Sequence, residues 1–272
     1  MSTFLLTDTR TGNTVVGMAT AEVTAVHEGH TLVVTINRPH VRNAINAATA
    51  EGIAAAMDEL DADPALRIGI LTGAGGTFSA GMDLKAFLHG ERPEIEGRGL
   101  AGITETPPRK PLIAAVEGYA LAGGCEIVLA CDLVVAAETA IFGIPEVTRG
   151  LVAGSGGLIR LPHRIPRQIA LEYALTGAHM PASVAHHWGL VNRLTPPGGA
   201  LDGARGLATA IASNGPLAVA MTKQIVTESA AWPLDSVWDT QRALVEGILA
   251  TDDAREGAAA FAEKRPAQWK GR

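Results

Sequence analysis

The chain has 272 residues, of which 47% are hydrophobic, 18% charged and 4% aromatic, and its formal net charge is −6. This composition supplies enough apolar surface for a folded core and excludes a disordered chain, and the length predicts one large domain with at most a small appendage. An acidic chain with few aromatic side chains is poorly suited to bind nucleic acid, which rewards basic patches and stacking rings.

The apolar runs predict neither a membrane partner nor export. Glycine or a charged residue interrupts each run well before the roughly 20 residues needed to span a bilayer. The first 20 residues mix Thr, Asp, Arg and Gly and lack the apolar centre of a secretory signal. The two cysteines, Cys125 and Cys131, lie in one apolar stretch, which is typical of reduced packing residues. We therefore expect a cytoplasmic protein.

The first predicted elements are two strands and a helix. β-Branched runs at residues 22–27 and 31–37 predict strands joined by a hairpin at Glu28-Gly29. Apolar residues then recur at helical spacing between positions 53 and 60, and this helix should end at Asp63-Pro64.

Three further short strands are predicted at residues 66–72, 111–116 and 132–136. A glycine-rich turn over residues 73–81 follows the first of them, and Gly123-Gly124 precede an apolar stretch between the other two. Because strand patterns alternate with helical ones, the sequence predicts parallel strands connected by helices, which is an α/β fold.

After about residue 196 the pattern becomes mostly helical. Helices are predicted over residues 201–211, 234–245 and 254–263, each with an apolar stripe of its own. These stripes must pack against the same domain or against a partner subunit, and we favour the partner. The charged, glycine-punctuated segment 89–99 is predicted to be a mobile loop.

Motifs for cofactors and nucleophiles are incomplete. Residues 73–78 lack the third glycine of a dinucleotide fingerprint, and Met82 and Asp83 replace the Lys and Ser/Thr of a phosphate loop. Ala153 stands where a nucleophile elbow requires glycine. The histidines show no metal-binding spacing. We therefore expect neither a metal nor a redox cofactor.

One carboxylate, Glu126, lies in an otherwise small or apolar stretch over residues 119–131. Burying an isolated carboxylate is costly or keeps it protonated, so such a stretch usually has a use for the group. The alternative is that Glu126 points to solvent. A second carboxylate, Glu146, would complete a general acid–base pair, but the sequence alone does not place it beside Glu126.

Glycines near Glu126 favour an oxyanion site. Gly123-Gly124 would let a helix N-terminus approach a ligand with free N–H groups, and the Gly81-Met82 turn offers another free N–H after a strand. Donors of this kind stabilise a developing oxyanion.

Four ordered segments resemble signatures of the crotonase (enoyl-CoA hydratase/isomerase) superfamily. They lie at residues 78–85, 110–126, 142–146 and 261–265, and the likeness extends from about Glu22 to Arg272. The resemblance implies a spiral of ββα repeats over residues 21–196 and a helical trimerisation region over residues 197–272. It also implies homotrimers or dimers of trimers. Residues 1–20 form an N-terminal extension without an assigned role.

The resemblance also implies roles for individual residues. Met82 and Gly123 match the two positions whose backbone N–H groups hold the thioester oxygen. Glu126 and Glu146 match the two carboxylates of hydratases, whereas isomerases usually keep only the later one. The positions implied for coenzyme A are the backbone at Asn43, Ala44, Ala80, Asp83 and Leu84, together with Lys264 of a neighbouring subunit. The alternative for Lys264 is an ordinary solvated lysine.

Residues 150–161 depart from the usual hydratase pattern and, with residues 261–272, are similar to carnitinyl-CoA dehydratases. Both reactions add or remove water beside an acyl-CoA carbonyl, so this departure affects the substrate rather than the chemistry. We predict an enoyl-CoA hydratase of fatty-acid or related acyl-CoA metabolism that needs no cofactor, since coenzyme A is part of the substrate. The alternatives are a carnitinyl-CoA dehydratase-like hydro-lyase, a Δ3,Δ2-enoyl-CoA isomerase and a non-catalytic acyl-CoA-binding relative.

Overall fold

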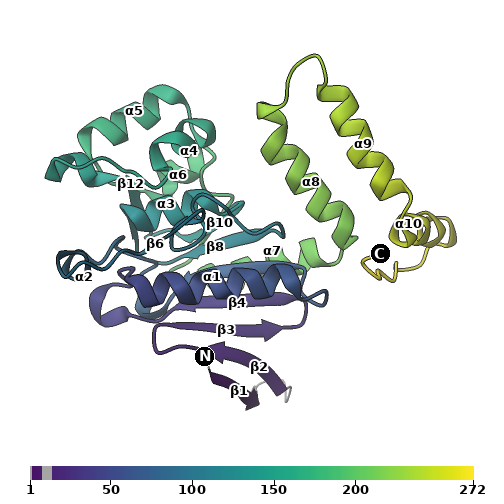
Figure 1. The fold of residues 1–272 in the computed structure, drawn as a ribbon, viewed down its shortest axis with the longest axis horizontal. Coiled ribbons are helices and arrows are strands. Elements are labelled where there is room, and N and C mark those ends of the chain that lie inside the picture. The colour runs from purple at the N-terminus through teal and green to yellow at the C-terminus, as the bar shows by residue number, and fades with distance from the viewer. Residues whose placement is uncertain (1, 8–13) are drawn as a thin grey trace.

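The computed structural model describes residues 2–7 and 14–272, and it describes side chains from residue 20 onward. An eight-stranded sheet forms its centre (Figure 1). In spatial order its strands are β1 (Ser2–Thr7), β2 (Thr14–Ala19), β3 (Val23–Glu28), β4 (Thr31–Ile36), β5 (Ile68–Gly73), β8 (Leu112–Val116), β10 (Leu133–Ala137) and β13 (Arg193–Thr195). A three-stranded sheet consists of β12 (Met180–Pro181), β11 (Ile141–Gly143) and β9 (Tyr119–Leu121).

Helices connect and cover these sheets. The α-helices are α1 (Ala47–Ala62), α2 (Leu84–Leu88), α3 (Gly123–Ala130), α4 (Gly157–Arg164), α5 (Arg167–Thr176), α6 (Ala182–His187), α7 (Ala200–Ala212), α8 (Pro216–Glu228), α9 (Val237–Leu249) and α10 (Asp252–Glu263). Short 3-10 turns are η1 (Pro39–Val41), η2 (Ala74–Gly76), η3 (Pro145–Arg149) and η4 (Ser229–Ala231). The predicted hairpin, first helix and three parallel strands are all present, so the predicted α/β fold is confirmed.

Successive strands alternate between the two sheets, which makes the chain spiral. Strand β8 of the large sheet leads to β9 of the small sheet and then to α3, and β10 leads to β11 and then to η3. Strands β9 and β11 pair in parallel. The segment after β5 joins the small sheet through a bridge between Ser79 and Ala120. These pairings bring three segments close together: the glycine-rich turn after β5, the first residues of α3, and η3.

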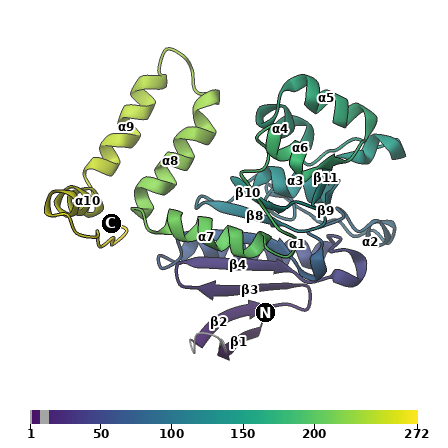
Figure 2. The ribbon, with the colours of Figure 1, turned by 180° about the vertical axis from the view of Figure 1, so that it is seen from behind.

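Helices α1 and α7 lie on opposite faces of the large sheet (Figures 1 and 2). Helix α7 approaches through small side chains at four-residue spacing that are buried against β5, β8 and β10: Ala200, Ala204, Ala208 and Ala212. We favoured a partner subunit for the apolar stripes after residue 196, and for this helix that preference is wrong. The alanine side chains leave room for the helix to sit directly on its own sheet.

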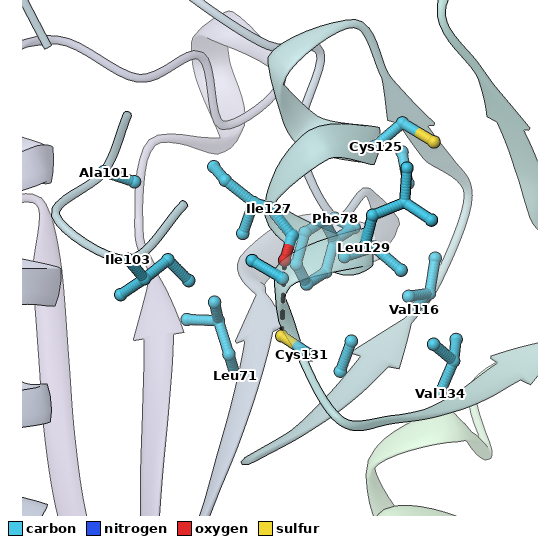
Figure 3. Packing of buried hydrophobic residues seen from close by; sticks show 14 of the residues in the cluster. Leu71, Phe78, Ala101, Ile103, Val116, Cys125, Ile127, Leu129, Cys131 and Val134 are labelled. Atoms are coloured by element: carbon cyan, nitrogen blue, oxygen red, sulfur yellow. Dashed lines mark hydrogen bonds between the residues drawn. The ribbon is translucent and has the colours of Figure 1, made fainter. Parts of the chain in front are cut away.

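Helix α3 is buried along its whole length, because it lies between the two sheets. All eight of its residues are buried. Figure 3 shows Ile127 and Leu129 packed beside Phe78, with Cys131 donating to the Ile127 carbonyl. Burial raises the pKa of both the Cys125 and Cys131 thiols to about 12. A helix fixed so firmly holds the carboxylate it carries, Glu126, in one place.

Segment 89–99, predicted to be a mobile loop, contains most of a short hairpin. Strands β6 (Glu94–Ile95) and β7 (Gly99–Leu100) pair antiparallel. Arg98 ties the hairpin to α1 through two bonds to the Asp58 carboxylate, at 2.8 and 2.9 Å. Local composition could not predict this hairpin, because the Asp58 carboxylate that binds Arg98 lies 40 residues away in the sequence.

The N-terminal extension, for which the sequence offered no role, adds strands to the large sheet. Strands β1 and β2 pair antiparallel, and β2 pairs with β3. Residues 2–7 and 14–19 therefore continue the sheet beyond the β3–β4 hairpin.

Candidate active site

Two backbone N–H groups, those of Met82 and Gly123, lie side by side without acceptors. A bridge pins the first turn, because Ile45 N–H donates to the Gly81 carbonyl and Asp83 N–H donates to the Ile45 carbonyl, both at 2.8 Å. Met82 N–H is thereby turned away from the bridge. Gly123 opens α3, where an N–H has no helical acceptor. Neither group donates to any acceptor within the described ranges.

The two turns are in direct contact. A Cβ added at Gly81 would lie 2.9 Å from the Gly123 nitrogen, and one added at Gly123 would lie 3.5 Å from the Met82 nitrogen. Gly81 has φ +95°, a conformation that favours glycine. Two adjacent, unpaired donors are suited to hold an oxygen on which negative charge develops.

Residues around Gly123 fix the direction of its N–H. A Cβ at Gly124 would lie 2.3 Å from the Ser79 carbonyl oxygen, so only glycine permits this approach. Ala122 adopts φ 51° and ψ −128°, a conformation that typically costs a non-glycine residue about 1–3 kcal/mol. The surrounding structure holds this strain in part through the Ala122 N–H, which donates to the Gly143 carbonyl at 2.9 Å.

Glu126 is buried, with 3% of its surface exposed, so the alternative in which it points to solvent is wrong. Its Oε1 accepts hydrogen bonds from the N–H groups of Ser155 at 2.7 Å and Gly157 at 2.9 Å. Burial raises the pKa of Glu126, while these N–H groups and the Arg160 guanidinium oppose the rise. Oε2 accepts no hydrogen bond from the described residues.

Glu146, on η3, lies near enough to Glu126 for the charge of Glu126 to act on it. Its Oε2 is buried and has no partner among the residues that the structure describes. Burial raises the pKa of Glu146 and the charge of Glu126 raises it further, whereas its own backbone N–H and Arg149 oppose the rise. Both glutamates also raise the pKa of the buried Cys125 thiol. The structure thus brings together the two carboxylates that the sequence could not place side by side.

The side chains of Asn43 and Asp83 are already engaged in the fold. Asn43 is fully buried and donates to the carbonyls of Ala74 at 2.8 Å and Thr77 at 2.6 Å. Asp83 caps α2 and pairs with Arg38 at 2.9 Å. Burial raises the pKa of Asp83, but the Ala86 N–H and Arg38 outweigh it and hold the pKa below its usual value. Their side chains thus shape the Met82 turn, and only backbone groups remain for a ligand.

The other predicted residues divide into two groups. Ala44 and Ala80 are half-buried and lie beside the Met82 turn, and Leu84 begins α2 with 49% of its surface exposed. Lys264 ends α10 at φ 54°, at the opposite end of the molecule from α2 (Figure 1). A role for Lys264 at this site within the same chain is therefore excluded, and its role in a neighbouring subunit stays a prediction.

Sequence reasoning missed three contributors to the site. The Ser155–Gly157 turn was considered as a failed nucleophile elbow and as part of the departing segment 150–161, although its run of glycines was the signal for a close approach to Glu126. Nothing in the sequence indicated a role for Arg160, apart from its position in residues 150–161, which depart from the usual hydratase pattern. Leu100 was also missed; a Cβ at Gly123 would lie 2.6 Å from its Cδ2, so Leu100 closes one side of the paired donors.

Residues 2–7 and 14–272 contain neither a metal-binding cluster nor a membrane-spanning helix. They contain no group of three or more His, Cys, Asp or Glu side chains able to hold a metal ion. None of the helices in these ranges is long and apolar enough to cross a membrane.

The chain is similar to known proteins over most of its length. The family model described as enoyl-CoA hydratase/isomerase matches residues 27–272. The chain is 57% identical to an enoyl-CoA hydratase from Mycobacterium tuberculosis H37Rv, covering 93% of this chain and 100% of that one with a TM-score of 0.92. An enoyl-CoA hydratase structure from Mycobacterium marinum is 59% identical with the same coverage and TM-score. A carnitinyl-CoA dehydratase from Salmonella enteritidis PT4 is 42% identical over 252 residues, or 90% of this chain and 96% of the relative.

Proposed function

The chain belongs to the crotonase (enoyl-CoA hydratase/isomerase) family and is a hydro-lyase of that family, and on this premise we propose that it adds water reversibly to a trans-2-enoyl-CoA to give a 3-hydroxyacyl-CoA. The thioester oxygen binds between the N–H groups of Met82 and Gly123. Negative charge builds on that oxygen as the enolate forms, so donors already aimed at it lower the barrier.

The environments of the two carboxylates support different roles for them. Glu126 receives two N–H donors and faces Arg160, and these favour its charged form. Glu146 has a buried oxygen without a donor among the described residues and lies in the field of Glu126, and both features favour its neutral form. When two neighbouring carboxylates share a proton, the member that accepts more hydrogen bonds keeps the charge. The shared proton therefore resides on Glu146.

This assignment gives a balanced reaction. Ionised Glu126 accepts a proton from water as the water oxygen bonds to C3. Protonated Glu146 donates its proton to C2 as the enolate collapses, and the thioester oxygen loses its charge. Proton exchange with solvent then restores both side chains. Hydration thus requires a carboxylate and a carboxylic acid at the same time.

The paired carboxylates beside the two free N–H groups are the observation that carries the proposal. Its test is a panel of trans-2-enoyl-CoA thioesters, followed by the loss of the conjugated double-bond absorbance and by identification of the 3-hydroxyacyl product. Failure of every member to gain water would refute a hydratase and leave the isomerase and the non-catalytic acyl-CoA-binding relative, which double-bond migration distinguishes. Because of the 42% identical dehydratase, carnitinyl-CoA is assayed separately for loss of water, followed by the gain of that absorbance, although the hydratase structures are more similar over a comparable length.

We propose that coenzyme A contacts the backbone around Asn43-Ala44 and Ala80–Leu84, since these residues adjoin the Met82 turn and leave backbone groups available. The proposed setting is acyl-CoA metabolism, including β-oxidation, in the cytoplasm. Two free, buried cysteines are compatible with a reducing compartment.

Segment 89–99, which contains β6 and the first residue of β7, is proposed to set acyl selectivity rather than the rate of the chemical step. It leads directly into Leu100, which lies against Gly123. Exchanging residues 89–97 for a shorter Gly/Ser segment, with Arg98 retained, is expected to change the ranking of kcat/KM across the panel. The carboxylates and donors lie outside the exchange, so kcat on the best remaining substrate should change little. An unchanged ranking would identify the hairpin as a surface feature only.

Assembly through the helices that follow α7 is also proposed, as a homotrimer or a dimer of trimers. No residue of α8 or α9 is buried, and Leu234 and Trp238 are 93% and 70% exposed. Figures 1 and 2 show both helices standing apart from the sheets. Apolar faces of this kind normally pack against another surface. Sedimentation at micromolar concentration is expected to give the mass of three or six copies, and a monomer would contradict the proposal.

A further inference from the structure

Arg160 is a half-buried cation without a structural partner. Its side chain forms no hydrogen bond or ion pair with any residue in the described part of the chain. Helix α4 requires only the Arg160 backbone N–H, which donates to a carbonyl. The neighbouring Arg164 differs, because its guanidinium donates to the carbonyls of Cys131 at 2.8 Å and Asp132 at 3.0 Å at the end of α3. An unpaired cation is costly to bury, so its position calls for a reason.

The Arg160 guanidinium covers the turn that holds Glu126. A Cβ added at Gly156 would lie 2.2 Å from its Nη1 and 3.5 Å from its Cζ. Gly156 adopts φ +96°, and its carbonyl accepts the Arg160 N–H at 2.9 Å. The residues on either side, Ser155 and Gly157, are the two whose N–H groups donate to Glu126 Oε1. The cation therefore lies directly behind the carboxylate's two donors.

We propose that Arg160 is a positioning residue that packs against this turn and keeps Glu126 negatively charged for its role as the base, an inference that rests on the proposed hydratase function. The guanidinium acts through the Ser155–Gly157 turn and through its charge.

The other charges near Glu126 do not replace that of Arg160. Glu146 approaches from η3 with a charge of the same sign, and the buried Cys125 thiol precedes Glu126 on α3. Arg149 faces Glu146 rather than Glu126, and Arg164 lies behind Arg160 and repels it. Burial and Arg164 both lower the pKa of Arg160, while Glu126 opposes them. Arg160 is thus the cation that acts on the base.

The direction in which loss of the Arg160 charge changes the pH dependence of activity can be predicted. Without Arg160 the pKa of Glu126 rises, so a larger fraction of Glu126 is protonated and inactive at low pH. The acidic limb of the kcat/KM profile of Arg160→Gln is expected to move upward by about one pH unit, which means about tenfold lower kcat/KM below the limb. On the plateau above the acidic limb, where Glu126 is ionised in both proteins, the variant should approach wild-type activity. Arg160→Lys keeps a cation and should recover most of the shift.

A matched control is Arg167→Gln, which removes the same charge from an exposed position on the next helix and should leave the profile unchanged. Equal loss of activity at every pH, with the limb in place, would show that Arg160 only supports the fold and would overturn the proposal. So would a glutamine variant that shifts the limb no more than Arg167→Gln does.

A measurement without substrate separates this inference from the hydratase proposal. The Glu126 carboxyl carbon is followed by 13C NMR during pH titration of labelled enzyme, with Glu126→Gln used for assignment. Its titration is expected to move upward in Arg160→Gln, and to a smaller extent in Arg160→Lys. If the glutamine variant does not fold, Arg160→Met removes the charge and keeps most of the side-chain length, and no displacement of the Glu126 titration in it overturns the proposal. If wild-type enzyme hydrates no enoyl-CoA, the function fails while this titration still decides the role of Arg160.

Discussion

Replacing Glu126 with glutamine is expected to lower kcat for hydration by about 10²-fold or more while the protein stays folded and still binds acyl-CoA. The glutamine oxygen can still accept the N–H groups of Ser155 and Gly157, so the turn keeps its partners. An amide cannot take up the proton of the attacking water, and the base is lost. Glu146→Gln should be equally damaging, because an amide does not protonate C2.

Steady-state hydration of the best enoyl-CoA, together with calorimetric binding of a saturated acyl-CoA, measures the two effects separately. Glu172→Gln, at an exposed position on α5, is the matched control and should behave as wild type. More than about a tenth of wild-type kcat in Glu126→Gln would contradict the paired-carboxylate mechanism, given the loss expected for a positioned base. Full retention of double-bond migration in that variant would instead favour the isomerase alternative.

The second large effect is expected from removing one oxyanion donor. Gly123→Pro deletes an N–H that serves no acceptor in the described chain, and proline is accepted at the first position of a helix. The thioester oxygen then keeps only the Met82 N–H, and kcat should fall by about 10²–10³-fold.

Gly123→Ala is the control for this variant, because it retains the N–H and adds a Cβ. That Cβ would lie 2.6 Å from Leu100 Cδ2, the far end of a flexible side chain that can move aside. The alanine variant should therefore lose much less activity than the proline variant at similar thermal stability. Equal losses in the two would mean that the added volume, rather than the missing donor, accounts for the effect.

Local patterns in the sequence were sufficient for most of the fold and for half of the site. β-Branched runs and helical spacing identified β3, β4, α1, β5, β8 and β10, because side-chain periodicity directly reports which face of an element is buried. Glycines marked the turn at Met82 and the start of α3, since close backbone approach requires them. A lone carboxylate in an apolar run identified Glu126 as a buried charge.

Tertiary structure alone decided what surrounds that charge. Glu146 reaches Glu126 because β9 and β11 pair in parallel, and the Ser155–Gly157 turn comes from 29 to 31 residues further along the chain. Periodicity shows that a face is buried but not which segment covers it, so neither the donors nor Arg160 were visible. The ionisation of a carboxylate depends on those contacts. Local sequence patterns thus identified Glu126 and Glu146 as the candidate residues, and the crossovers between the two sheets decided the environments on which their proposed base and acid roles depend.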